Sequence, residues 1–320
     1  PGSAGFGVAA PAAPPRESAL YIATGCWGCE GADTGLSAVI TDSQGTTTVA
    51  QVPPPELETN ERILSYSGTP DGSLLAATPC AGDGCGFMSP TTSRSRTLVS
   101  RDGGATWKDV TPSGLPAWSK VSMLEASPSD PATAWAAVDR HRLDDRRPHV
   151  YVTHDFGATW TETVAGLPAT AFVYAVREDP VDPRLIFAAT HVGVFVSFDG
   201  ATSWQSLQGN LPTTDVTDAT IHGSDLVLAT QGRGIWVLDD FAALRELAGA
   251  IAAAKPALFP PEPAYRLRPN ENRDTPIPQE EPMAANPPAG AILDYYLPAA
   301  SAQEVRLEIL DANGTPVRAF

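Results

Sequence analysis

The richest cluster of ionisable side chains in this 320-residue chain is the segment 139–149, in which nine of eleven residues are charged or histidine. Arginine can grip a carboxylate through two parallel hydrogen bonds, and aspartate can take up a proton or bind a cation. The alternative is that these charges pair with one another and fix the loop on its neighbours. We predict that this segment and a later loop bind a ligand through Arg140, His141, Arg142, Asp144, Asp145 and Arg233.

The four cysteines form two close pairs, Cys26 with Cys29 and Cys80 with Cys85. Two disulfides in an exported protein are the favoured interpretation, with local pairing preferred among the three connectivities that four cysteines allow. A zinc site made of four thiolates is the alternative. A thioredoxin-like redox role would need a strand–helix context that this sequence does not show. We therefore predict no metal and no cofactor.

An octapeptide with the pattern Ser/Thr-x-Asp-x-Gly-x-Thr/Ser-Trp occurs three times, at residues 100–107, 153–160 and 197–204. Aspartate can accept N–H bonds within its own turn, glycine permits a positive φ, and tryptophan offers a large face for burial. The third copy has Ala201 in the glycine position, so we expect its turn to differ. A structural role is predicted for the shared residues, which are Asp102, Gly104, Trp107, Asp155, Gly157, Trp160, Asp199 and Trp204.

Short apolar runs recur around these octapeptides and predict the strands that position them. Five such runs lie at 20–24, 74–78, 134–138, 186–190 and 226–230. Each is followed by another run, at 35–41, 96–100, 149–153, 193–197 and 234–238, and four are preceded by one, at 62–67, 120–126, 172–177 and 216–221. Four-stranded antiparallel blades at spacings of roughly 40–60 residues indicate an all-β fold, the β-propeller.

Five blades are visible, and the outer two are incomplete. The first has no obvious first strand, and the last has no octapeptide after its third strand. Either the two ends combine to close a ring or, as we favour, the chain is an arc of a larger propeller. The loop between the second and third strands is long in the first three blades and short in the last two, where it contains His191 and Gln231. Insertions confined to one face often mark that face as functional.

The octapeptide resembles the Asp-box, the bacterial neuraminidase repeat of sialidases and sortilin-type receptors. Residues 98–240 resemble the sortilin-type, glycosyl-hydrolase-like bacterial propellers through segments 137–148, 177–190 and 228–240, and residues 285–298 resemble the segment that follows the propeller in that group. The resemblance implies an exported propeller whose Asp-boxes lie away from the ligand side. It implies no particular activity, because this architecture serves enzymes and receptors alike. The sialidase segment Phe/Tyr-Arg-Ile-Pro is missing, since Arg62-Ile63 is followed by leucine.

Outside the repeats, the amino-acid composition and the pattern of apolar residues change. Residues 1–18 are small residues and proline and predict a flexible leader before the propeller at 19–240. Alanine and leucine at helical spacing predict a helix over 241–255, and residues 241–290 are interpreted as this helix and a proline-rich linker. Residues 291–320 read as the start of a β-sandwich that is cut short, with a hairpin turn at Asn313-Gly314.

The charge and hydropathy of the chain disfavour some classes of binding partner. The net charge is −16 and the isoelectric point about 4.6, which disfavours nucleic acid and anionic membrane surfaces. No apolar run reaches the roughly 18 residues of a transmembrane helix. We expect an extracellular or periplasmic protein of the cell envelope. The favoured function is a module that binds a polypeptide or carbohydrate ligand through its long strand 2–3 loops. The alternative is a glycoside hydrolase, exo-acting or sialidase-like, with carboxylates on the same face.

Overall fold

The computed structural model describes residues 94–116, 118–264, 290–300 and 304–320, together with shorter stretches at 8–9, 18–24, 35–41, 47–53, 55–56, 65–68 and 74–81. The chain forms two compact units, Pro1–Leu238 and Asp239–Phe320. Within the described residues, no helix has both the length and the apolar character needed to cross a membrane. The predicted disulfides lie outside the described residues, because Cys26, Cys29 and Cys85 and the side chain of Cys80 are not among them.

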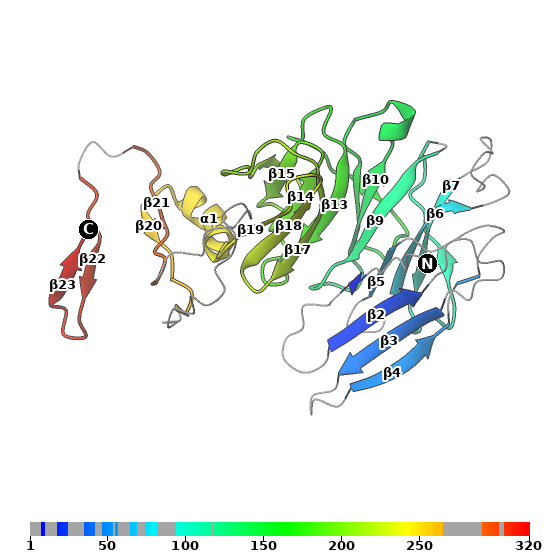
Figure 1. Cartoon of the computed structure of the whole chain (residues 1–320), viewed down its shortest axis with the longest axis horizontal. Helices are drawn as coiled ribbons and strands as arrows, with labels where there is room; N and C mark the ends of the chain where they lie inside the picture. The colour runs from blue at the N-terminus through cyan, green and yellow to red at the C-terminus, as the bar shows by residue number, and fades with distance from the viewer. Residues whose placement is uncertain are drawn as a thin grey trace, which may run out of the picture. The chain divides into compact units, whose positions relative to one another are not determined.

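The first unit contains five antiparallel sheets that follow one another along the chain (Figure 1). Four sheets have four strands in chain order, and the fifth has three. The first two sheets are β1 (Val8–Ala9), β2 (Ser18–Thr24), β3 (Gly35–Thr41) and β4 (Thr47–Val52), then β5 (Ser65–Gly68), β6 (Leu74–Ala81), β7 (Arg94–Ser100) and β8 (Lys108–Asp109). The third sheet is β9 (Lys120–Ala126), β10 (Ala134–Asp139), β11 (Val150–Thr153) and β12 (Thr161–Glu162). The fourth is β13 (Val173–Glu178), β14 (Ile186–Thr190), β15 (Gly193–Ser197) and β16 (Gln205–Ser206). The fifth is β17 (Val216–His222), β18 (Asp225–Thr230) and β19 (Ile235–Leu238).

This architecture confirms the predicted all-β propeller class. The strands β3, β9, β14 and β15 have the predicted bounds, and most of the others differ by one or two residues at an end. One difference lies in the segment predicted as a flexible leader. Val8 pairs with Ile22 and Ala9 with Tyr21, so β1 supplies the first strand that the sequence did not reveal in the first blade. A two-residue strand in a run of alanine and proline carries too little alternation to be recognised from sequence.

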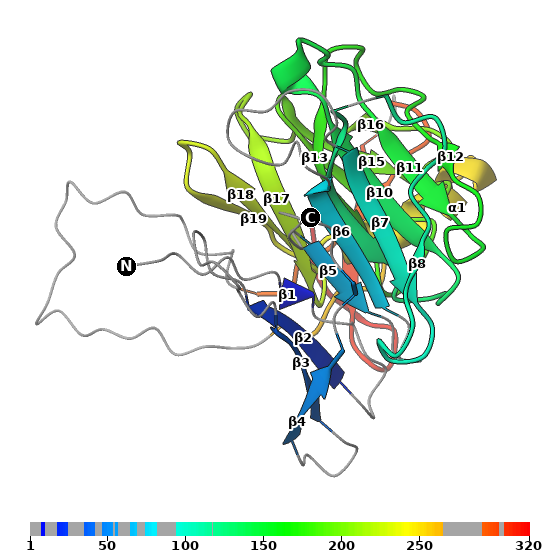
Figure 2. The same cartoon turned by 90° about the vertical axis from the view of Figure 1, so that its right-hand side faces the viewer.

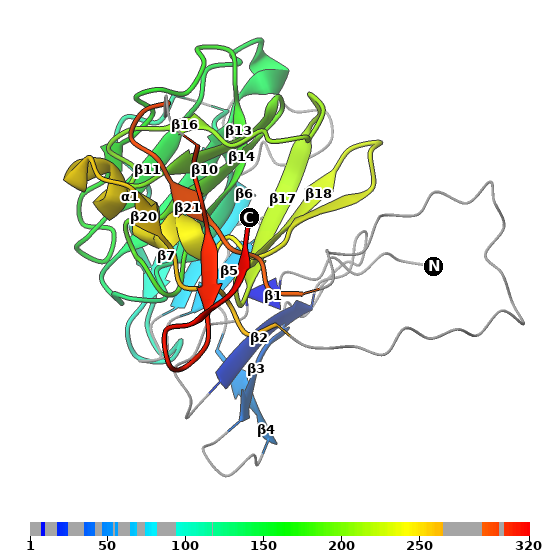
Figure 3. The same ribbon diagram turned by 90° about the vertical axis from the view of Figure 1, so that its left-hand side faces the viewer.

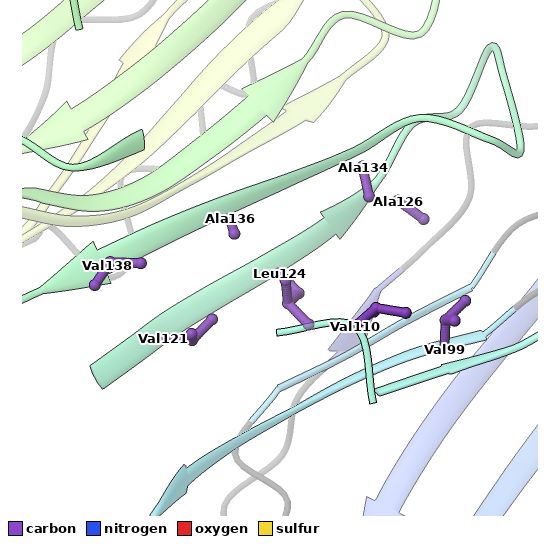
Figure 4. Packing of buried hydrophobic residues seen from close by; sticks show 8 residues of the cluster. All are labelled: Val99, Val110, Val121, Leu124, Ala126, Ala134, Ala136 and Val138. Carbon is purple, nitrogen blue, oxygen red and sulfur yellow. The ribbon is translucent and has the colours of Figure 1, made fainter. Parts of the chain in front are cut away.

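Successive sheets pack face to face, and their first strands lie next to one another (Figure 2). Strand β9 contacts β5, β6 and β13, and β17 contacts β13 and β14. One cluster shows how this packing works, because Val99 and Val110 of the second sheet meet apolar side chains of the third (Figure 4). Those partners on β9 and β10 are Val121, Leu124, Ala126, Ala134, Ala136 and Val138. Burial of such faces from water provides the main stabilisation of the unit.

The three octapeptides form the same hydrogen-bonded turn between the third and fourth strands. The first hydroxyl donates to the aspartate at 2.7–2.8 Å and accepts the N–H of the fifth residue at 2.8–2.9 Å. The aspartate accepts both the N–H and the hydroxyl of the seventh residue at 2.6–2.9 Å. The expectation that the third turn differs is wrong. Ala201 takes a left-handed φ of 65° and donates to Ser197 as glycine does in the other copies.

Each octapeptide tryptophan ties its sheet to the preceding one. The indole Nε1 atoms of Trp107, Trp160 and Trp204 donate to carbonyl oxygens at 3.1, 2.7 and 3.1 Å. The acceptors are Pro53, Val110 and Thr163, each the residue directly after the fourth strand of the preceding sheet. The same spacing recurs three times, so the indole fixes how each blade sits on its neighbour.

Close approach explains two of the glycines in these turns. A Cβ atom on Gly157 would lie 2.6 Å from Cγ2 of Val110, and one on Gly104 would lie 2.7 Å from the carbonyl oxygen of Pro53. Both glycines also have a positive φ, 81° and 93°. Conformation and space therefore both demand glycine at these positions.

The second unit contains a helix, α1 (Ala242–Ala253), and two pairs of short antiparallel strands. Strand β20 (Ala257–Leu258) pairs with β21 (Tyr295–Tyr296), which contacts α1 (Figure 3). Strand β22 (Glu308–Leu310) pairs with β23 (Pro316–Ala319). The carboxylate of Asp311 caps the predicted Asn313-Gly314 turn by accepting the N–H groups of Asn313 and Thr315 at 2.8 and 2.9 Å.

Replacement of Trp204 tests the tie between sheets. The side chain is only 4% exposed, so we expect Trp204→Ala to lower the free energy of unfolding by about 3–5 kcal/mol in chemical denaturation. Trp204→Phe keeps most of the apolar volume but leaves the Thr163 carbonyl without its donor, and should cost about 1–3 kcal/mol. A loss under about 1 kcal/mol for the alanine variant would contradict the packing described above.

Candidate functional site

The candidate site lies at the end of the sheets opposite the octapeptide turns. In an up-and-down antiparallel sheet, the loop between the second and third strands and the start of the first strand lie at one end, and the turn between the third and fourth strands lies at the other. We call the end with the strand 2–3 loops the loop end. It receives the β10–β11 loop, the β14–β15 turn and the first residues of β9, β13 and β17.

Arg140 and Arg147 of the β10–β11 loop both form ion pairs with Asp145. The carboxylate of Asp145 accepts Nε of Arg140 at 3.1 Å and two hydrogen bonds from Arg147, both at 2.8 Å. Arg140 also donates to the hydroxyl of Ser119 at 2.7 Å. The hydrogen bonds from Arg147 hold the pKa of Asp145 well below its usual range, against a smaller opposing effect of burial. Internal pairing, the alternative to ligand contact, therefore accounts for Arg140 and Asp145.

The remaining charged residues of the predicted set are exposed. Arg142 lies in the short 3₁₀ turn His141–Leu143, and Asp144 follows it with a left-handed φ of 61°. Neither side chain is bonded to any residue that the structure describes. Arg233 lies in the separate β18–β19 turn, where its carbonyl accepts the indole N–H of Trp236 at 3.1 Å. The structure brings Arg140, Asp145 and Arg147 together, and it records no contact of Arg233 with them among the described residues.

A buried phenylalanine organises the centre of the loop end. Phe172, 6% exposed, stacks with the imidazoles of His141 and His191 at centroid distances of 4.7 and 4.3 Å. The ring of Tyr174 meets Phe172 edge-on at 5.1 Å. The three partners of Phe172 are half-buried, and Phe172 contacts the ring of each of them. These four residues are the Phe172 cluster.

The histidines of this cluster are held differently. Nδ1 of His141 lies 2.6 Å from the carboxylate of Asp139, which also accepts the backbone N–H of His141 at 2.9 Å. Nδ1 of His191 is buried and has no hydrogen-bond partner among the described residues. Burial lowers the pKa of His191, with the charge of Asp215 opposing the shift. A neutral His191 therefore keeps an unused ring nitrogen at this end.

The first strands of three sheets have a bulge near their start, at the loop end. The pairing of β9, β13 and β17 with their neighbours skips Ser122, Tyr174 and Thr217, one residue in each strand. Bulges commonly re-aim a side chain beside a functional site. The hydroxyl of Ser122 donates to the carbonyl of Ala137 at 3.1 Å and approaches that of Tyr174 at 3.4 Å. Burial raises the pKa of Tyr174, and nearby Asp215 and Asp139 add to the shift, so the phenol stays protonated.

An exposed tryptophan lies beside the ion-paired loop. Trp118 is 36% exposed and has a positive φ of 68°, an uncommon conformation for a bulky residue. It precedes Ser119, the residue that Arg140 holds. Strained conformations persist where the surroundings over-determine them, and they cluster at ligand sites. Trp118 therefore offers an aromatic face at the loop end.

Sequence reasoning missed several of these residues. Phe172 and Tyr174 were read only as members of a buried strand, and Trp118 and Asp215 carried no motif. The bulge that sets Tyr174 apart is defined by strand pairing and therefore gives no signal in the sequence. Among the described residues, no group of three or more histidine, cysteine, aspartate or glutamate side chains is arranged to hold a metal ion.

A second charged network lies along the first strands and is structural. Arg177 on β13 donates to Glu125 on β9 at 2.7 Å, to Asp218 on β17 at 2.8 Å and to the carbonyl of Ala219 at 2.6 Å. One guanidinium therefore joins three consecutive sheets. Burial raises the pKa of Glu125, and the charge of Arg177 opposes that shift.

Comparison with known proteins gives similarities of fold alone. No protein-family profile and no curated protein matches the chain. Similar solved structures include an ancestral GH74 enzyme (15% identity, TM-score 0.45, covering 71% of this chain and 28% of that one) and the Dos1 propeller (15%, TM-score 0.42, 69% and 53%). YCF48 bound to D1 peptide is another (13%, TM-score 0.32, 68% and 73%). The chain thus spans less than a third of the GH74 enzyme.

Adjacent aspartates allow a matched test of the ion-paired loop. Asp145→Asn removes the charge that Arg140 and Arg147 share, so we expect faster amide hydrogen exchange at residues 141–144. Asp144→Asn is the control, because its side chain is exposed and asparagine tolerates the left-handed conformation. Equal exchange in both variants and the parent protein would show that these ion pairs do not hold the loop.

Proposed function

We propose that this chain is a propeller module that binds a polypeptide or a glycan at its loop end. The observation that carries the proposal is the Phe172 cluster. A buried ring holds the side chains of His141, Tyr174 and His191, and each of these three residues is partly exposed. A surface whose hydrogen-bonding groups are held in place before binding loses little conformational entropy when a ligand arrives.

The surrounding residues extend this surface. Trp118 supplies an exposed aromatic face, and Arg142 and Asp144 supply opposite charges that are unpaired among the described residues. An aromatic face beside hydrogen-bonding groups can bind either a peptide backbone or the hydroxyl groups of a sugar. The ion pairs of Asp145 support the proposal indirectly, because they fix the loop that carries Arg142 and Asp144.

We favour binding over hydrolysis because three carboxylates are already bonded to other side chains. Asp139 is bonded to His141, Asp145 to two arginines, and Glu125 to Arg177, so each already has a fixed partner. Glycoside hydrolysis instead needs two carboxyl groups that face a sugar from opposite sides. The arrangement of these residues supports a rigid scaffold for recognition.

The experiment screens the purified protein against peptide and glycan arrays. A ligand found in this way should lose about tenfold in affinity with Trp118→Ala or Arg142→Ala, the equivalent of one lost contact of about 1.4 kcal/mol. Lys108→Ala, at an exposed position on β8, is the control and should bind as the parent does.

Two outcomes would contradict the proposal. Unchanged binding by both loop-end variants would place the site elsewhere. Turnover of an oligosaccharide, abolished by a single aspartate or glutamate substitution, would make the chain a glycoside hydrolase instead.

A further inference from the structure

The fifth sheet lacks the strand that completes the other four. Sheets one to four end in β4, β8, β12 and β16, whereas the fifth ends at β19. Strand β19 therefore has an open edge among the described residues. An open edge presents unpaired N–H and C=O groups to which another chain can add.

The register identifies which groups are open. Leu228 is paired with Trp236 and Val227 with Val237, as Ala188 is with Phe195 and Phe187 with Val196 in the fourth sheet. Ile235 and Val237 are thus the equivalents of Val194 and Val196. The N–H of Thr230 donates to the carbonyl of Gly234, so by alternation the N–H and C=O groups of Ile235 and Val237 point away from β18.

In the complete sheets, the third-strand carbonyl at this position accepts a hydrogen bond. The carbonyls of Thr97, Val150 and Val194 accept the N–H groups of Val110, Thr163 and Leu207 at 2.8–2.9 Å. Each donor is the residue directly after a fourth strand. By the same rule the carbonyl of Ile235 should accept an N–H, and no described residue supplies it.

The face of the fifth sheet that carries these two side chains is also exposed. Ile235 is 75% and Val237 48% exposed, whereas Val194 and Val196 in the fourth sheet are 1% and 2% exposed. Their cross-strand partners Ala229 and Val227 lie on the same face and are not buried either, so both this face and the edge of β19 are accessible among the described residues.

The hydrogen bonds of the octapeptide tryptophans point to one more unpaired carbonyl among the described residues. The carbonyls of Pro53, Val110 and Thr163 each accept an indole N–H from the next sheet. The next acceptor in this series is the carbonyl of Leu207, and it receives no hydrogen bond from any residue that the structure describes. A tryptophan at the start of a fourth strand on β19 would reach it by the same geometry.

We propose that β19 binds an extended segment of another polypeptide, which adds as the fourth strand of the fifth sheet. The three internal fourth strands define the chemistry of this partner. They read Trp-Lys-Asp-Val, Trp-Thr-Glu-Thr and Trp-Gln-Ser-Leu, with a tryptophan, two polar residues and the residue whose N–H bonds the third strand. The segment is therefore of the form Trp-polar-polar-x, in β conformation. This site is separate from the loop end and does not depend on the function proposed for it.

The probe is a synthetic peptide with the sequence of residues 159–165, Thr-Trp-Thr-Glu-Thr-Val-Ala, blocked at both ends. It is titrated into the full ¹⁵N-labelled chain, and the amide signals of Ile235 and Val237 should shift. N-methylation of the peptide residue that corresponds to Thr163 removes the N–H aimed at Ile235 and should weaken binding about tenfold, as one lost hydrogen bond does. The matched control carries the methyl group on the residue that corresponds to Glu162, whose N–H points outward, and should bind unchanged. Alanine in place of the tryptophan should weaken binding by a similar factor.

Several results would overturn the proposal. Equal weakening by the two methylated peptides, or shifts confined to residues away from β19, would show that no strand adds there. Protection of the Ile235 and Val237 amides from hydrogen exchange in the free chain would show that this chain fills its own edge. Protection that grows with protein concentration would make the occupant a second copy.

Discussion

One repeated contact sets how the sheets of the first unit sit on one another: an octapeptide tryptophan donates a hydrogen bond to the carbonyl of the residue that follows the preceding sheet. In the three sheets that carry an octapeptide, the acceptor lies at the same place, and the Trp204 side chain that makes one of these bonds is buried. The aspartate of the turn fixes the strand connection by accepting two bonds from the seventh residue, directly before the tryptophan. Glycine or alanine in left-handed conformation brings the turn close to the neighbouring sheet. The motif thus couples the local turn to the packing between blades.

The octapeptide turns lie at one end of the sheets, and the proposed binding surface lies at the other. The octapeptides hold register at one end, and the loops and bulges at the other carry residues that the register does not need. Ser122, Tyr174 and Thr217 occupy the same bulged position in three strands, and all three side chains carry a hydroxyl group.

The sequence predicted the scaffold well because its signals are local. Apolar runs bounded by turns located β9, β14 and β15 to the residue, and the octapeptide placed the strand 3–4 turns. It failed where the outcome depends on contacts between distant segments. Ala201 was judged by the absence of glycine, whereas the hydrogen bond to Ser197 holds its backbone in the same turn. Phe172 looks like any core residue, and only the fold brings His141 and His191 against it. The charge-rich loop allowed two interpretations, and the arginine partners of Asp145 could be identified only in three dimensions.

Hydrogen exchange of the tryptophan indole groups tests the central contact most directly. The indole N–H of Trp204 is bonded to Thr163 in a buried position, whereas the ring of Trp118 is exposed. The two signals can be assigned by single substitution and compared in one spectrum. The account predicts that the Trp204 N–H exchanges far more slowly than that of Trp118, because exchange requires the sheets to separate. Equal exchange rates for the two indoles would contradict it.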